Sequence, residues 1–146
     1  MPTEATTRQL VVFTLGSEEY ALPIRQVHEI IRYTEPRSVA AESGWVRGVI
    51  SLRGKIVPVY DLASRLGCAG CEDAAERKIV IVEAATQLAG VVVDDVAEVI
   101  TVDADQLERI PTADEAAIDA IVKLDDRLIV LLSPAGLFGV AAEIAA

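Results

Sequence analysis

The segment Val46–Leu62 constrains the fold of this chain more than any other stretch. It contains two largely apolar runs rich in β-branched residues, which flank an Arg-Gly-Lys step and end in an Asp-Leu pair. β-Branched residues favour strands, and Gly54 can adopt the positive backbone angle that a tight bend needs. The segment therefore predicts a hairpin of two strands, Val46–Leu52 and Lys55–Tyr60, followed by a helix. The side chain of Arg53 is expected to be presented at the bend.

The composition indicates a small β-rich unit with an aliphatic core. A chain of 146 residues buries roughly 68–70% of its unfolded surface, which is enough for a real core. Hydrophobic residues make up 52% of the chain but aromatic residues only 4%, so valine, isoleucine, leucine and alanine must fill that core. Short clusters of β-branched residues point to strands. The expected fold class is all-β.

Charge and hydropathy narrow the classes of partner. The net charge of −10 opposes binding to nucleic acid or to anionic lipid. The longest apolar runs, 79–82 and 128–132, are far shorter than the ~20 residues of a membrane helix. The first seven residues show no secretory pattern of a cationic segment followed by an apolar one. We expect a cytoplasmic protein with no direct membrane insertion.

An internal repeat divides the chain. Leu22–Ile31 aligns with Val91–Ile100 without a gap at an offset of 69, and the hairpin has a counterpart at Ile118–Leu132 at an offset of 72. Chance similarity between valine-rich strands is the alternative explanation. Two consecutive blocks in the same order favour a true repeat, with the division inside Gly67–Glu76. We expect each half to form a small closed barrel.

The pattern of apolar and turn residues assigns elements to both halves. The first half is expected to hold strands at Gln9–Leu15, Tyr20–Pro23, Val46–Leu52 and Lys55–Tyr60, with a helical turn near Arg25–Ile31. The second is expected to hold strands at Lys78–Glu83, Gln87–Val93, Glu98–Val102, Ile118–Leu124 and Arg127–Leu132. Asp61 and Ser133 are suitable N-cap residues for a short helix after each hairpin.

Motifs of catalysis and metal binding are weak. The spacing around Gly54 and Lys55 does not match a phosphate-binding loop. Cys68 and Cys71 have the spacing of a dithiol or of half a zinc site, but the chain has no further cysteine and one histidine, His28. Two reduced thiols in a loop are the favoured interpretation, and a small dithiol oxidoreductase remains the alternative. His28 is expected to lie on the surface.

Paired carboxylates suggest one further chemistry. Glu29 and Glu98 occupy matching positions in the two halves, and paired carboxylates can serve as the general acid and base of an enzyme. Solvated faces are the favoured interpretation, because carboxylates are abundant in this chain. The position equivalent to Arg53 in the second half is Asp125, so the repeat keeps the hairpin but replaces its cation. We interpret Arg53 as a recognition residue.

Three segments of the first half form an ordered set of motifs, Phe13–Ile24, Val27–Ile31 and Gly48–Leu62. Together they resemble the CheW family of bacterial chemotaxis coupling proteins, and Gly90–Val96 and Asp126–Leu132 resemble that family's second half. The resemblance covers roughly residues 10 to 138. The chain departs from the family where serine, at position 51, precedes Leu-Arg-Gly in place of asparagine, and where segment 36–44 lacks a common Val-Pro pair.

The resemblance implies an all-β fold of two SH3-like five-stranded β-barrel subdomains packed around a shared core, with short helices. One CheW-like domain is expected over 1–146, with subdomains at approximately 9–67 and 77–140. The implied function is a non-enzymatic adaptor without a cofactor, which couples transmembrane chemoreceptors to a CheA-type histidine kinase in arrays. A coupling protein of a related non-flagellar chemosensory pathway and a regulatory domain of the kinase itself, which shares the fold, are alternatives.

The resemblance also implies two binding surfaces. The cytoplasmic tips of methyl-accepting chemoreceptors are expected to dock at a groove between the barrels, lined or supported by Glu29, Arg53, Gly54, Gly90 and Val99. The regulatory domain of the kinase is expected to contact an apolar patch, for which the candidates are Val11, Ile24, Val27 and Ile30. Burial in the barrel core is the alternative for each of these four residues.

Overall fold

The computed structural model describes residues 7–39, 45–66, 77–84, 87–109 and 117–138. Its elements are β1 (Thr7–Leu15), β2 (Glu18–Pro23), the 3₁₀ turn η2 (Ile24–Gln26), β3 (Val27–Arg32), β4 (Val46–Leu52), β5 (Lys55–Asp61), α1 (Leu62–Leu66), β6 (Lys78–Ala84), β7 (Gln87–Val93), β8 (Asp95–Asp103), the 3₁₀ turn η4 (Ala104–Gln106), β9 (Leu107–Glu108), β10 (Ile118–Leu124), β11 (Arg127–Leu132) and α2 (Pro134–Leu137). The all-β prediction is confirmed.

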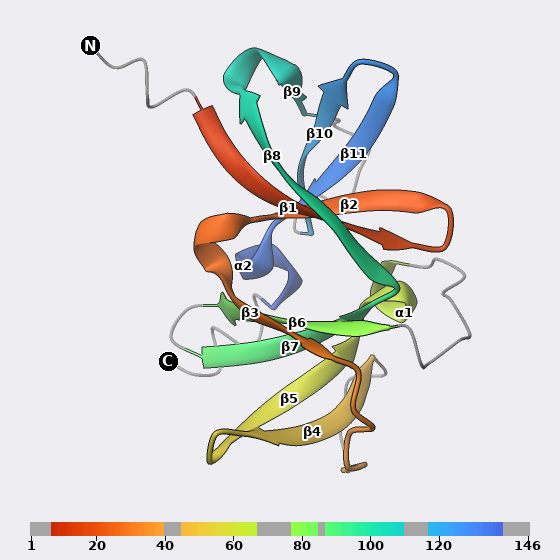
Figure 1. Ribbon diagram of the computed structural model, residues 1–146, viewed down its shortest axis with the longest axis vertical. Coiled ribbons are helices and arrows are strands. Elements are labelled where there is room, and N and C mark those ends of the chain that lie inside the picture. Colours follow the sequence, from red (N-terminus) through yellow and green to blue (C-terminus); the bar gives the residue numbers. More distant parts are fainter. Residues whose placement is uncertain (1–6, 40–44, 67–76, 85–86, 110–116, 139–146) are drawn as a thin grey trace.

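The strands form two sheets that lie one above the other, with α1 and α2 beside the junction (Figure 1). The six-stranded sheet has the order β8-β1-β2-β11-β10-β9, and the five-stranded sheet has the order β3-β6-β7-β5-β4. The first sheet exceeds the predicted five strands because the two-residue strand β9 pairs with β10 at Ile121 and Val122. Both sheets mix antiparallel and parallel neighbours.

Both sheets curl toward closure at their edges. In the six-stranded sheet the edge strands β8 and β9 are joined by only three residues, those of η4. In the five-stranded sheet the chain after β3 returns to the other edge, where Arg37 and Val49 exchange two backbone hydrogen bonds of 2.8 and 2.9 Å. Gly48 allows this approach, because a Cβ atom there would lie 2.2 Å from the carbonyl oxygen of Arg37.

The sheets exchange strands between the two halves of the sequence. The β1–β2 hairpin of the first half lies between β8 and β11 of the second, and β6–β7 lies between β3 and β5. When each strand is replaced by its repeat equivalent, the order β8-β1-β2-β11-β10 becomes β3-β6-β7-β5-β4. The repeat is therefore present in the topology. Each sheet nevertheless combines strands from both halves, so the sheets do not coincide with the predicted subdomains 9–67 and 77–140.

Three apolar clusters fill this arrangement. One lies inside each sheet, centred on residues such as Leu10 and Ile129 in the six-stranded sheet and Val59 and Ile79 in the five-stranded sheet. The third lies between the sheets and receives side chains from both, together with those of α1 and α2. This third cluster is the predicted shared core.

Most predicted elements are confirmed, and one is confirmed only in part. β10 and β11 have the predicted bounds, and each helix begins after its predicted cap: the Ser133 hydroxyl accepts a hydrogen bond from the Gly136 amide, and the Asp61 carboxylate accepts one from that of Ser64. The predicted helical turn at Arg25–Ile31 is instead η2 followed by the strand β3. The segment is extended because β3 pairs along its length with β6.

Candidate interaction site

The β4–β5 hairpin presents a cation on a tight two-residue bend. Leu52 pairs with Lys55, so that Arg53 and Gly54 alone form the turn. Both have positive φ, 51° and 84°, as a type I′ turn requires. No described atom lies within 4 Å of the position where a Cβ of Gly54 would be. The prediction of a presented arginine is confirmed, because its side chain is 72% exposed.

Glu29 holds this arginine from another strand. The carboxylate of Glu29, on edge strand β3, forms an ion pair with the guanidinium of Arg53. The Glu29 side chain is 21% exposed, so the better-buried partner orients the more exposed one. The structure therefore brings together two of the residues predicted to bind the receptor. An arginine carries five N–H donors, so this contact leaves part of its binding capacity unused.

The other barrel contains an equivalent pair that sequence reasoning missed. Glu98 on β8, the repeat equivalent of Glu29, accepts a hydrogen bond of 2.8 Å from Arg127 at the start of β11. Arg127 also donates to both carboxylate oxygens of Glu19, at 3.1 and 2.9 Å. These bonds, first to Glu19 and then to Glu98, raise the pKa of Arg127. The second half therefore keeps a cation, which lies two residues after Asp125, the equivalent of Arg53. Asp125 alone had suggested that this cation is lost.

Each matching carboxylate therefore serves an ion pair. Glu29 binds Arg53 and Glu98 binds Arg127, and the two carboxylates belong to edge strands of different sheets. This arrangement gives them a role in tying an edge strand to a hairpin. Nothing in their contacts sets up an acid and base pair.

The other predicted receptor-binding residues differ in accessibility. Val99 on β8 is 52% exposed and can contact a partner directly. Gly90 is buried in the middle of β7, where a Cβ would lie 2.8 Å from Cγ2 of Ile79 and 3.3 Å from Cδ1 of Ile81. Gly90 can therefore support the site only by permitting close packing of β6 and β7.

The predicted kinase-binding residues do not form one exposed patch. Val11 is buried, with 2% exposure, in the part of β1 that is covered on both faces. Ile24 in η2 and Val27 in β3 are half-buried, and Val27 packs against the shared core. Ile30 is 40% exposed and is the member of the set that presents an open apolar surface.

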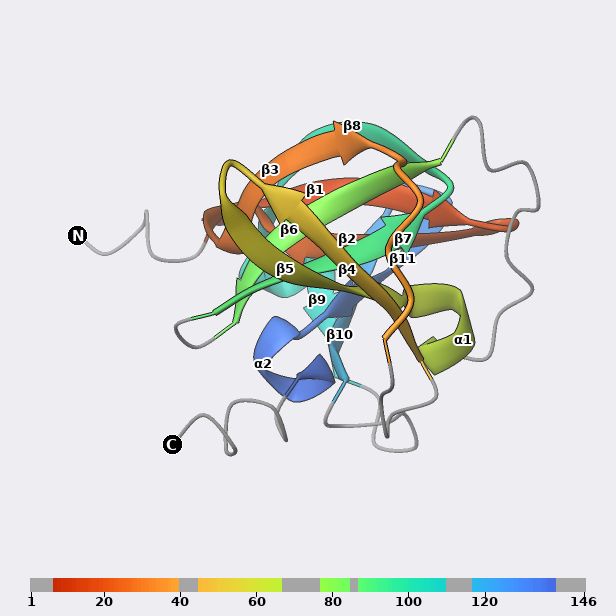
Figure 2. The same cartoon turned by 90° about the horizontal axis from the view of Figure 1, so that it is seen from below.

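β3 and β8 lie on the same side of the molecule in Figure 2, and the β4–β5 hairpin reaches toward β3. The helices α1 and α2 lie on the opposite side. Glu29 and Ile30 on β3 and Val99 on β8 therefore come from strands on the same side of the molecule, which we call the strand side.

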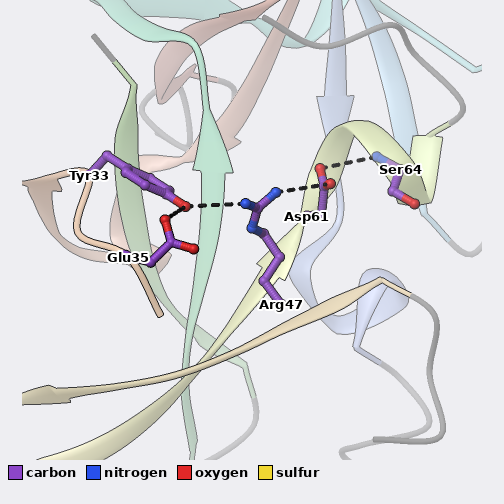
Figure 3. A network of polar contacts seen from close by, with 5 residues as sticks. All are labelled: Tyr33, Glu35, Arg47, Asp61 and Ser64. Carbon is purple, nitrogen blue, oxygen red and sulfur yellow. Dashed lines mark hydrogen bonds and ion pairs between the residues drawn. The ribbon is translucent and has the colours of Figure 1, made fainter. Parts of the chain in front are cut away.

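A second polar network, also missed from the sequence, ties the chain after β3 to α1 (Figure 3). Arg47 donates to the Tyr33 hydroxyl at 3.2 Å and pairs with Asp61 at 3.4 Å. Tyr33 in turn donates to Glu35 at 3.1 Å, and Asp61 caps α1 through Ser64. Arg47 is the extra residue of a β-bulge in β4, and a bulge redirects a side chain. This signal is not visible without the strand register.

A family model described as the CheW-like domain matches residues 9–142. The chain belongs to the CheW family. The family prediction made from the motifs is thereby confirmed.

Relatives within the CheW family cover most of the chain. It is 29% identical over 135 residues to a probable chemotaxis protein CheW of Rhizobium etli, covering 90% of this chain and 87% of that protein. It is 33% identical over 128 residues to the chemotaxis protein CheW of Bacillus subtilis, covering 85% and 82%. The crystal structure of the scaffolding protein TtCheW from Thermoanaerobacter tengcongensis matches with a TM-score of 0.84 and 36% identity, covering 92% and 90% of the two chains.

Three further predictions concern features outside the two binding surfaces. Cys68 and Cys71 fall in 67–76, outside the described residues, so the dithiol alternative stays a prediction. Within the described ranges, no helix combines the length and hydrophobicity needed to cross a bilayer. His28, predicted at the surface, is exposed on β3 as the extra residue of a bulge.

Proposed function

We propose that this CheW-family chain is a non-enzymatic adaptor that couples the cytoplasmic tips of transmembrane chemoreceptors to a CheA-type histidine kinase. It acts by binding both partners at once, and its own chemistry is limited to recognition. It would work in the cytoplasm, held at receptor arrays by these partners. The observation that carries the proposal is the Arg53 guanidinium, exposed at a rigid bend and oriented by Glu29 on an edge strand.

The geometry supports a receptor contact at this hairpin. A guanidinium is suited to carboxylates of a partner, because its donors form a fixed planar fork. The two-residue turn and the Glu29 contact reduce the conformational entropy that binding would cost. Val99 adds an exposed apolar side chain on the strand side. Receptor helix tips that carry both acidic and apolar residues fit this combination.

The kinase contact is assigned to a surface around Ile30, with Ile24 and Val27 as half-buried neighbours in sequence. An apolar centre with a polar rim is typical of protein interfaces. Val11 is buried and would contribute to the kinase contact only through the packing of β1, and Gly90 would contribute to the receptor contact only through the packing of β6 and β7.

Co-sedimentation tests the proposal. Vesicles that display receptor signalling fragments are mixed with the kinase, with or without this protein, and the pelleted kinase and its autophosphorylation are measured. We expect the protein to increase both quantities. If it binds neither the vesicles nor the isolated regulatory domain of the kinase, the proposal is refuted.

A further inference from the structure

Each sheet contains one pair of parallel neighbouring strands that are hydrogen-bonded over only a few residues. We call the region beside these residues, where the two strands are no longer paired, a fork. β2 and β11 pair at Tyr20–Val130 and Ala21–Leu131, and β5 and β7 pair at Val59–Gly90 and onward. By the repeat, Ala21 is equivalent to Gly90 at the offset of 69, and Leu131 is equivalent to Val59 at the offset of 72. The pair Ala21–Leu131 therefore corresponds to the pair Gly90–Val59. The two forks therefore have the same strand register and can be compared residue by residue.

An ion pair closes the fork of the six-stranded sheet. Arg127, at the start of β11, donates two hydrogen bonds to the carboxylate of Glu19 on β2. The two groups are about one-third exposed, at 36% and 28%. This side-chain bridge spans the strands where their backbones are no longer paired.

The fork of the five-stranded sheet keeps the cation but lacks the carboxylate. Lys55 is the repeat equivalent of Arg127, and Leu88 is the equivalent of Glu19. Within the described ranges Lys55 forms no ion pair, although it is exposed. An apolar residue thus stands where the other sheet supplies the cation's partner.

A hollow of about 390 Å³ marks the unfilled fork. The described residues that line it are Lys55, Ile56, Val57, Pro58, Gln87 and Leu88, and among these Lys55 is the charged residue. Ile56 is 68% exposed, the largest value among the exposed large apolar side chains of the described residues. We call this hollow, with Lys55, Ile56 and Leu88, the open fork.

We propose that the open fork binds an acidic side chain of the receptor tip, in the manner in which Glu19 occupies the other fork. The partner's carboxylate pairs with Lys55, and its methylene groups pack on Ile56 and Leu88. The inference rests on the proposed function, because the open fork continues from Arg53 along one hairpin. Two cations within three residues make this hairpin complementary to an acidic segment.

Three variants of the full-length chain test the open fork. Ile56→Gln removes its apolar surface, and Lys55→Glu reverses its charge. Leu128→Gln is the matched control, because Leu128 is the repeat equivalent of Ile56 and is 66% exposed. Binding is measured with vesicle-displayed receptor signalling fragments and, separately, with the kinase regulatory domain, and circular dichroism checks that each variant is folded.

We expect Ile56→Gln to weaken receptor binding about tenfold, which corresponds to about 1.4 kcal/mol, because the variant loses the apolar surface that the partner would bury. Lys55→Glu should weaken it more at low salt than at high salt. Both variants should bind the kinase domain as wild type does, and Leu128→Gln should bind both partners normally.

Arg53→Glu distinguishes the two levels of failure. If Arg53→Glu lowers receptor binding while Ile56→Gln and Lys55→Glu do not, the open fork is refuted and the proposed function stands. If wild type binds no receptor fragment, the proposed function fails and the open fork fails with it. Loss of kinase binding in Ile56→Gln, or equal loss of receptor binding in Leu128→Gln, would also overturn the assignment.

Discussion

Reversing the Arg53–Glu29 ion pair separates two roles for Arg53, recognition of a partner and support of the hairpin. In Arg53→Glu two carboxylates face each other at the bend. Because the Arg53 side chain is 72% exposed, losing the pair costs only about 0.5 kcal/mol of stability. Repulsion between two charges about 4 Å apart in water adds about 1 kcal/mol. Arginine and glutamate both carry a Cβ at this positive φ, so the strain of the turn is unchanged.

The total of about 1.5 kcal/mol is small beside the 5–15 kcal/mol by which domains are usually stable. Arg53→Glu should therefore fold, and a loss of coupling would not reflect unfolding. The double variant Glu29→Arg with Arg53→Glu restores an ion pair with the opposite polarity. Its free energy of unfolding should return to within about 0.5 kcal/mol of wild type. The partner would nevertheless meet a carboxylate at the bend in place of the guanidinium.

Stability is measured by urea unfolding followed through Trp45, the one tryptophan of the chain. Coupling is measured as receptor-dependent kinase autophosphorylation on vesicles. We expect Arg53→Glu and the swapped variant to lose coupling alike, with stability recovered only in the swap. Full recovery of coupling in the swap would refute recognition and leave support of the hairpin as the role of Arg53. A stability loss above about 3 kcal/mol in Arg53→Glu would refute the exposed-pair energetics.

Three further predictions follow from packing and burial. Gly48→Ala should lower the free energy of unfolding by about 3 kcal/mol, because φ at Gly48 is 152° and the new Cβ would displace the backbone of Arg37, which is hydrogen-bonded to β4. Gly54→Ala, whose new Cβ meets open space, should lower it by only about 1 kcal/mol. Equal losses for the two variants in urea unfolding would contradict this prediction. Burial raises the pKa of Tyr60, so stability should fall as pH rises past 10, where the unfolded chain ionises first. Tyr60→Phe should flatten that fall in a thermal melt, and an unchanged slope would disprove it. Ile30→Asp should remain folded, as circular dichroism would show, because Ile30 is exposed. Its affinity for the kinase regulatory domain, measured by calorimetry, should fall about tenfold. An affinity equal to that of wild type would show that Ile30 is not part of the kinase surface.

Local features of the fold were predictable because they depend on neighbours in sequence. The hairpin bend at Gly54 and the helix caps at Asp61 and Ser133 each involve residues within three positions of one another. The repeat was visible for the same reason, as a pattern of apolar positions. It recurs even in the β-bulges, which fall at the equivalent residues Arg47 and Asp119.

Strand partners were not predictable by the same reasoning. Alternation of apolar residues shows which face of a strand is buried, but not which strand lies beside it. The division after α1 followed the repeat, whereas the structure places the β1–β2 and β6–β7 hairpins in the opposite sheets. The misassigned turn at Arg25–Ile31 has a related cause, because its apolar residues fit a helical spacing and only the pairing with β6 makes the segment extended.

The candidate site shows the same limit at the level of single side chains. Val11 and Ile30 are both aliphatic residues in strands, yet one is 2% exposed and the other 40%. The difference arises because residues 10–13 of β1 are buried on both faces of the strand, whereas β3 alternates between half-buried and exposed residues. The contacts of Arg127 were missed because Glu19 is distant from it in sequence. Those of Arg47 were missed because a β-bulge sets the direction of its side chain.

The structure changes the argument for Arg53 while keeping its conclusion. A cation that the fold needs is expected in both halves, and the Glu98–Arg127 pair shows that the second half also has a cation beside its hairpin. The two arginines nevertheless differ, because among the described residues Arg127 binds two carboxylates and is 36% exposed, whereas Arg53 binds one and is 72% exposed. The same difference recurs two residues along, where Arg127 has Glu19 and its equivalent Lys55 faces Leu88. In the part of the chain that the structure describes, the β10–β11 hairpin pairs Lys123 and Arg127 with carboxylates of the chain, whereas in the β4–β5 hairpin Arg53 has one carboxylate partner and Lys55 has none. This unused positive charge at the β4–β5 hairpin supports recognition of a partner.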